Sequence, residues 1–159
     1  MVELFKTYTD VFYWNMANRK SRFIGNQGGT TSSKTISILQ VLSHIAIGEQ
    51  AVVTVVGQDI PNLKKGSLRD FQNILLPQMT PHYHKWFDDY NKSDRIYTLP
   101  NGSILEFASF SDWQDAKNGK RDYLFLNEAN GLPYSIAEQL MTRTRCQVFL
   151  DWNPDSEFW

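Results

Sequence analysis

The 159-residue chain contains one cysteine, Cys146, and has a net charge of only −1 at pH 7. A single cysteine excludes a framework of intrachain disulfides and suits a reducing compartment. Because no global basic field is present, any DNA contact would come from local patches or from several subunits together. No apolar run approaches the roughly 20 residues of a membrane helix, and the N-terminus lacks a signal-peptide pattern. We therefore expect a soluble, intracellular protein without membrane contacts.

Hydrophobic residues make up 42% of the chain, which is enough for one domain with a substantial core. Strand-like apolar runs alternate with stretches of helical period, and this predicts a three-layer α/β fold with a mostly parallel sheet. Asn101-Gly102 between two alternating runs predicts a β-hairpin. We expect strands over residues 22–27, 51–57, 96–99, 103–107, 122–126 and 146–151, helices over 35–47, 62–79 and 133–142, a short helix or irregular segment over 4–17, and a polar loop over 109–120.

The most informative segment is a run of small residues that ends in Lys34-Thr35, between a predicted strand and a predicted helix. This arrangement is typical of a phosphate-binding loop, in which backbone N–H groups and the helix N-terminus attract an anion. Lys34 would reach the terminal phosphates of a nucleotide, and the Thr35 hydroxyl would bind Mg²⁺. The candidate nucleotide-binding residues are Gln27, Gly28, Gly29, Thr30, Thr31, Ser32, Ser33, Lys34 and Thr35.

Ser33 departs from the phosphate-loop pattern, because it stands where the last glycine of G-x-x-x-x-G-K-[ST] is expected. A residue other than glycine held at positive φ costs about 1–2 kcal/mol, so the surroundings of Ser33 must tolerate that conformation. The alternative is a polar turn that caps the helix, with Ser32 or Ser33 as the N-cap residue.

A second group of polar residues follows the apolar strand 122–126. Nucleotide hydrolysis needs a carboxylate that orients or deprotonates the attacking water, and Glu128 is the candidate for this role. Asn127 stands where an aspartate would usually contact the water shell of the metal. Since its side chain is neutral, Mg²⁺ would depend more on Thr35 and on the phosphates. The alternative is that Asn127-Glu128 only begins a loop and that Glu128 is solvated.

Three segments, residues 27–35, 121–130 and 150–154, together resemble the large terminase subunit of tailed bacteriophages. The likeness extends over nearly the whole chain, from about residue 5 to 159. It implies a P-loop NTPase fold of the ASCE type and an N-terminal ATPase domain over residues 1–159. The second half of such a subunit, a nuclease domain with an RNase H-like fold, would lie beyond Trp159.

The resemblance also implies a function. The family hydrolyses ATP with Mg²⁺ and uses the energy to move double-stranded viral DNA into a procapsid. It works in the host cell cytoplasm as a ring of subunits at the portal protein, together with the small terminase subunit. Lys34 and Thr35 match the Walker A lysine and hydroxyl, and Asn127 and Glu128 match the Walker B pair, with Glu128 as the catalytic carboxylate.

The segment Asp151-Trp152-Asn153-Pro154 matches the coupling motif of the family, which senses the γ-phosphate; we name Asn153 and Pro154 for this role. Two departures concern arginines. Thr30 and Thr31 occupy loop positions where the family often has one. Lys117 lies near the position of an arginine that acts in trans on the nucleotide of a neighbouring subunit, and a lysine lacks the guanidinium fork. We therefore expect weak ATPase activity from the isolated domain.

Two other functions stay open on the sequence alone. The first is that of a different P-loop ATPase, such as a helicase or recombinase fragment. The second is that of a nucleotide-binding switch that does not hydrolyse ATP. Lys64, Lys65 and Arg69 suggest a strip that faces DNA, although such charge runs are usually solvated. His82 and His84 have no metal-ligating partners near them in the sequence, and we expect them to be surface or packing residues and not metal ligands.

Overall fold

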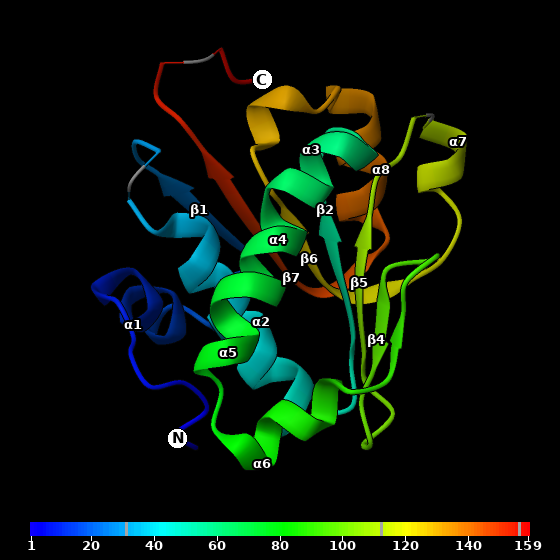
Figure 1. Cartoon of the computed structure of the whole chain (residues 1–159). Coiled ribbons are helices and arrows are strands. Elements are labelled where there is room, and N and C mark those ends of the chain that lie inside the picture. Colours follow the sequence, from blue (N-terminus) through cyan, green and yellow to red (C-terminus); the bar gives the residue numbers. More distant parts are fainter. Residues whose placement is uncertain (31, 112, 156) are drawn as a thin grey trace.

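A computed structural model describes residues 1–30, 32–111, 113–155 and 157–159. It confirms the α/β fold: a mixed, seven-stranded sheet has the order β1-β7-β6-β2-β5-β4-β3, and its first five strands are parallel (Figure 1). The strands are β1 (Phe23–Gln27), β2 (Val52–Val56), β3 (Tyr90–Asn91), β4 (Ile96–Thr98), β5 (Ile104–Ala108), β6 (Arg121–Leu126) and β7 (Thr144–Trp152).

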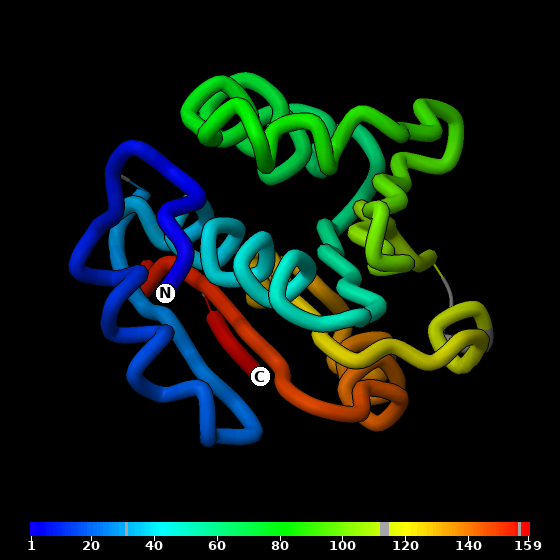
Figure 2. The backbone as a smooth tube through the Cα atoms, turned by 90° about the horizontal axis from the view of Figure 1, so that it is seen from below, coloured from blue at the N-terminus to red at the C-terminus, as the bar shows by residue number. Residues whose placement is uncertain are grey.

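Helices cover both faces of the sheet. The α-helices are α1 (Asp10–Ala17), α2 (Lys34–Gly48), α3 (Ile60–Lys65), α4 (Ser67–Asp70), α5 (Leu76–Gln78), α6 (Pro81–His84), α7 (Trp113–Ala116) and α8 (Tyr134–Thr142). A π-helical turn, η1 (Phe71–Leu75), and two 3₁₀ turns, η2 (Lys85–Phe87) and η3 (Ala129–Gly131), complete them. Figure 2 shows α2 along the sheet and α8 on its opposite side.

Alternate residues of the central strands enter two separate cores, because successive side chains of a strand point to opposite faces. Tyr123 and Phe125 of β6 belong to the larger core, which α1, α2, α3 and α4 cover. Leu124 and Leu126 belong to the smaller core beneath α8. The strand is therefore buried on both faces, as its continuous apolar character predicts.

The parallel strands bring the carboxyl ends of β1, β6 and β7 to one edge of the sheet. The strand β7 lies between the other two: Gln27 at the end of β1 is in register with Trp152, and Leu126 at the end of β6 is in register with Leu150. This edge is where parallel α/β sheets bind ligands. The fold thus places the predicted phosphate loop, Glu128 and the segment 151–154 side by side.

The predicted helix over residues 62–79 is wrong in its continuity. The chain breaks at Gly66, whose φ of −105° and ψ of −110° are not helical. A Cβ at Gly66 would lie 2.9 Å from the Asn62 carbonyl oxygen, so this break depends on glycine. The turn Phe71–Leu75 is π-helical, and its extra residue per turn leaves Ile74 40% exposed, although we expected Ile74 to face inward.

The predicted hairpin is confirmed. Strands β4 and β5 are antiparallel around Gly102, which has a φ of +85°. Several short elements of the described chain escaped prediction: β3, which extends the hairpin, the helices α6 and α7, and the turns η2 and η3; of these, α7 lies within the expected polar loop. Each has only two to four residues, too few for a hydrophobic period to be visible.

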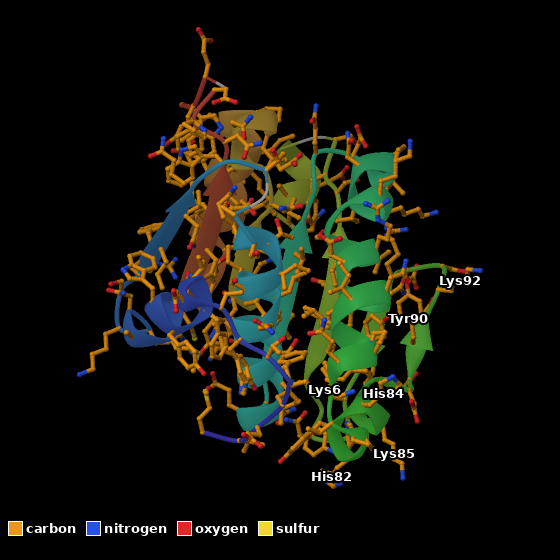
Figure 3. All side chains as sticks on the ribbon, turned by 60° about the vertical axis from the view of Figure 1, so that its left-hand side comes forward. Lys6, His82, His84, Lys85, Tyr90 and Lys92 are labelled. Carbon is orange, nitrogen blue, oxygen red and sulfur yellow. The ribbon has the colours of Figure 1, made fainter. Side chains whose placement is uncertain are left out.

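His82 and His84 lie on the surface, in agreement with the expectation from the sequence. Figure 3 shows His82, His84 and Lys85 at the end of the molecule remote from the phosphate loop, and the two histidines are exposed. Among the described residues, no group of three or more His, Cys, Asp or Glu side chains is placed to hold a metal ion. Contact of the exposed Lys64, Lys65 and Arg69 with DNA stays a prediction.

No helix within the described ranges combines the length and the apolar character that crossing a bilayer requires.

The N-terminal segment is fastened to α2 through Tyr8 and His44. The backbone N–H groups of Leu4 and Phe5 both donate to the Tyr8 hydroxyl, over 3.0 Å each, and this hydroxyl lies 2.9 Å from His44 Nε2. Since the hydroxyl oxygen already accepts two hydrogen bonds, it donates its own proton to a neutral imidazole. Burial, and then the charge of the N-terminal ammonium group, lowers the pKa of His44 from 6.5 to about 4.

We predict that acid weakens the fold through His44. Between pH 6.5 and about pH 4 the unfolded chain binds a proton at this residue and the folded protein does not, so the free energy of unfolding falls as the pH falls. Allowing for partial exposure, the loss is about 1–2 kcal/mol. Denaturant unfolding at several pH values should give a flatter profile for His44→Gln than for the wild type or for the surface variant His82→Gln. Equal slopes for all three proteins would contradict this.

Candidate nucleotide-binding site

The side chain of Lys34, the first residue of α2, lies inside the predicted phosphate loop. Its Nζ donates to the carbonyl oxygens of Gly28 and Gly29, the latter over 2.9 Å, and to Ser32 Oγ over 3.0 Å. A longer contact of 3.3 Å reaches Asn153 Oδ1. The ammonium group is therefore held where the loop and the end of β7 meet, and only 8% of Lys34 is exposed.

Ser33 adopts the left-handed conformation that the glycine of a phosphate loop would have, with a φ of 58° and a ψ of 17°. It is the N-cap residue of α2, but its side chain makes no capping hydrogen bond. The alternative of a serine that only caps the helix through its hydroxyl is therefore not supported for Ser33. The first N–H groups of α2 have no acceptor within the helix, and they point toward the loop.

The carboxylate of Asp151 joins three parts of the site. Its Oδ2 accepts a hydrogen bond of 2.8 Å from the Thr35 hydroxyl, and its Oδ1 accepts one of 2.6 Å from the backbone N–H of Glu128. The side-chain nitrogen of Asn127 donates to both carboxylate oxygens, over 3.1 and 3.2 Å, and also to Thr35 Oγ1 over 3.2 Å. Asp151 thus connects α2 with the ends of β6 and β7.

Two opposing effects act on the charge of Asp151. Burial raises the pKa of this carboxyl group, since only 2% of the residue is exposed. The hydrogen bonds from Glu128, Thr35 and Asn127, followed by the charge of Lys34, oppose this rise in the pKa but do not cancel it. With donors at both oxygens, the hydrogen-bond geometry matches the ionised carboxylate, which only accepts.

Glu128 lies two residues beyond the end of β6 and also has a left-handed backbone, with a φ of 52°. This conformation costs about 1–2 kcal/mol for a residue with a Cβ, and the hydrogen bond to Asp151 helps to hold it. The side chain is exposed and lines two cavities. It is therefore open to solvent at the mouth of the site and does not point to the far edge of the molecule.

The smaller of these cavities, of about 50 Å³, brings the three predicted segments together; its lining residues are Thr30, Lys34, Thr35, Glu128, Asp151, Trp152 and Asn153. The second, of about 190 Å³, lies between Glu128 and α3 and includes Asn127 and Lys65. No sequence pattern singled out Lys65 as a neighbour of Glu128. Its place at this cavity follows from the break of the helix at Gly66, which also lines the cavity.

Other predicted site residues are placed less centrally. Gln27 is exposed at the end of β1 and lines a different cavity, Pro154 is exposed, and Thr31 lies outside the described residues. Lys117 is exposed after α7 and does not line either cavity beside Glu128. The structure does not bring Lys117 to this site, and an action on a neighbouring subunit stays a prediction.

The site fits a magnesium ion that a nucleotide brings with it. The Thr35 hydroxyl and the Asp151 carboxylate are oxygen ligands of the kind that Mg²⁺ prefers. Because no group of His, Cys, Asp and Glu in the described ranges forms a metal site by itself, most ligands would have to be phosphate oxygens and water.

Known structures share this fold. No protein-family model matches the sequence, and no curated protein matches it. A structure of the large terminase from a thermophilic bacteriophage matches with a TM-score of 0.69 and 16% sequence identity, over 95% of this chain and 39% of that chain. Our chain has the fold of part of a large terminase.

Two further structures of the same phage terminase contain a nucleotide. The complex with ADP matches with a TM-score of 0.62 and 17% identity, over 94% of this chain and 38% of that chain. The complex with ATP-gamma-S matches with a TM-score of 0.60 and 15% identity, over 95% of this chain and 38% of that chain. Our chain spans less than two fifths of the length of the terminase chains that it matches. At sequence identities of 15–17%, this similarity is one of fold.

We predict that Ser33→Gly stabilises the protein, because glycine adopts the left-handed conformation of this position without a steric cost. The free energy of unfolding should rise by about 1 kcal/mol after allowance for the greater flexibility of glycine in the unfolded chain. Denaturant unfolding measures this change. Ser33→Ala is the matched control, since it removes the hydroxyl but keeps the Cβ, and it should bring no gain. A loss of stability in Ser33→Gly would show that the serine hydroxyl, not the strain, dominates.

Proposed function

We propose that this chain binds ATP with Mg²⁺ and hydrolyses it, as the motor domain of a large terminase subunit. The observation that supports this most directly is the small cavity lined by Lys34, Thr35 and Glu128, three residues with separate roles in phosphoryl transfer. The terminase fold and the nucleotide complexes of the phage terminase agree with this proposal.

In this proposal, Lys34 exchanges its contacts with the loop carbonyl groups for contacts with the β- and γ-phosphates. Glu128 accepts a proton from the attacking water, or orients it, in line with the bond between the γ-phosphorus and the bridging oxygen. That bond breaks to give ADP and phosphate. Thr35 holds the metal, and Mg²⁺, when bound, neutralises charge on the phosphate oxygens.

Asn153 provides a route for coupling to the rest of the molecule. Its Oδ1 accepts from Lys34 Nζ, so any movement of Lys34 toward a phosphate changes this contact. The neighbouring Trp152 stacks on Phe158 with ring centres 4.8 Å apart, and Trp159 donates to the Leu132 carbonyl oxygen over 2.9 Å. We infer that these contacts carry the change from the phosphates to the surface around η3 and α8.

The base of the nucleotide has a suitable place next to the loop. A cavity of about 370 Å³ lies between α1 and β1 and is lined by Trp14, Gly25 and Gln27. Trp14 is 51% exposed, so its ring has a face free for stacking, whereas Phe12 of the same helix is fully buried. Aromatic rings stack on nucleic-acid bases with about 1–3 kcal/mol each.

Translocation of double-stranded viral DNA into a procapsid is the work we propose for the hydrolysis. It would take place at the portal protein in the host cell, with the small terminase subunit and a ring of copies of this chain. A helicase fragment would instead unwind DNA without a portal. A switch module would bind ATP without hydrolysing it. This is the second candidate function, because the side chain of Asn127 is neutral where a carboxylate is usual.

We predict that Glu128→Gln separates hydrolysis from binding. Loss of the catalytic carboxylate should lower ATP turnover by about 100- to 10,000-fold while the affinity for ATP changes little. Phosphate release and isothermal titration calorimetry measure the two quantities. Lys34→Ala is the companion variant and should abolish binding. Equal, near-zero turnover in the wild type and in Glu128→Gln would favour the switch, and unchanged affinity in Lys34→Ala would remove the phosphate loop from the proposal.

We predict that Trp14→Ala weakens ATP binding by about 5- to 150-fold, the equivalent of one stacked base. The affinity for inorganic tripolyphosphate should stay the same, because it has no base. Competition titrations with the two ligands measure this difference. Tyr13→Ala is the control, since Tyr13 is similarly exposed on α1 but does not line the cavity. An equal loss for both ligands would place the base elsewhere.

A further inference from the structure

The end of β6 offers an amide where phosphoryl-transfer sites of this type usually have a carboxylate. Asn127 holds that position, and its side chain has no negative charge with which to balance a cation. In the structure the Asn127 amide nitrogen, a hydrogen-bond donor, points at Thr35 Oγ1 over 3.2 Å. A donor in this orientation does not ligate a metal ion, nor does it accept from metal-bound water.

A carboxylate is nevertheless present beside Thr35, on the neighbouring strand. Asp151 lies one residue beyond Leu150, the partner of Leu126 at the end of β6, so Asp151 is level with Asn127. Its Oδ2 is 2.8 Å from Thr35 Oγ1, shorter than the 3.2 Å between Asn127 Nδ2 and the same hydroxyl. The two side chains also contact each other at both carboxylate oxygens.

The hydrogen bonds of Thr35 leave room for a cation. A hydroxyl group has one proton and two lone pairs. The proton is donated to Asp151, and one lone pair accepts from Asn127. The remaining lone pair has no partner among these contacts, and Thr35 lines the cavity that also holds Lys34 and Glu128. The carboxylate thus fixes the direction in which Thr35 presents its oxygen.

We propose that Asp151 of β7 supplies the carboxylate that orients Thr35 and balances the charge of a nucleotide-bound magnesium ion, in place of the residue at position 127. This inference rests on the proposed function and assigns the metal site within it. Asp151 is a positioning residue, since it acts through Thr35. Compared with sites that have a carboxylate at the end of β6, the carboxylate lies on β7 here and the amide of Asn127 follows β6.

The test measures how much Mg²⁺ tightens the binding of ATP-gamma-S, by calorimetry with Mg²⁺ or with EDTA. Asp151→Asn should reduce this tightening by about 10- to 100-fold, with the affinity of each variant in EDTA as its own reference. Asp122→Asn is the matched control. Asp122 also accepts a backbone N–H, from Val52 over 2.8 Å, but at the opposite end of the sheet, and its variant should keep the full Mg²⁺ effect.

The double variant Asn127→Asp/Asp151→Asn returns the carboxylate to β6. Thr35 Oγ1 is within hydrogen-bond distance of both positions, so the exchanged pair can make the same contacts in reverse. We expect it to recover most of the Mg²⁺ effect that Asp151→Asn loses. Thermal unfolding followed by circular dichroism checks that each variant folds. If Asp151→Asn does not fold, the double variant decides: recovery supports the inference, and a folded double variant without the Mg²⁺ effect overturns it.

A folded Asp151→Asn protein with the full Mg²⁺ effect would overturn the inference and leave the proposed function intact. Failure of the wild type to bind ATP-gamma-S, or unchanged binding by Lys34→Ala, would instead overturn the proposed function and this inference with it. The two failures are distinct because the binding measured in EDTA reports on the phosphate loop without the metal.

Discussion

The arrangement of the site depends on the buried carboxylate of Asp151. A charge with 2% exposure is costly unless donors surround it, and here Thr35, Asn127 and the Glu128 N–H all donate to it. Each donor comes from a different part of the local structure: the start of α2, the end of β6, and the turn that follows. Because all three donate to the same carboxylate, it determines how the phosphate loop and Glu128 lie relative to each other.

The sheet makes this possible through its strand order. Because β7 is inserted between β1 and β6, its carboxyl end emerges between the phosphate loop and the Asn127-Glu128 pair. Two residues near this edge, Ser33 and Glu128, have left-handed backbones that side chains with a Cβ disfavour. Strain of this kind persists only where the surroundings over-determine the conformation, and it concentrates at functional sites.

The parts of the fold that the sequence predicted correctly are those set by local patterns. The strands β2, β6 and β7 contain continuous apolar runs, and the hairpin follows from Asn101-Gly102. The prediction of one continuous helix over residues 62–79 was wrong. The break at Gly66 and the π turn are not visible in the spacing of hydrophobic residues along the sequence. The break at Gly66 places Lys65 at the cavity beside Glu128, and the π turn leaves Ile74 exposed. A helical period assumes a constant number of residues per turn, whereas this segment has both α-helical and π-helical turns.

By itself, the sequence determined the phosphate loop, the left-handed strain at Ser33 and the polar residues that follow two apolar strands, because each of these is encoded by neighbouring residues. Only the tertiary structure decided that Asp151 is the partner of Thr35 and Asn127. These residues are separated from Asp151 by 116 and 24 positions in the chain. These residues come together because the order of the strands in the sheet differs from their order in the sequence. They form hydrogen bonds there because a buried carboxylate needs donors around it.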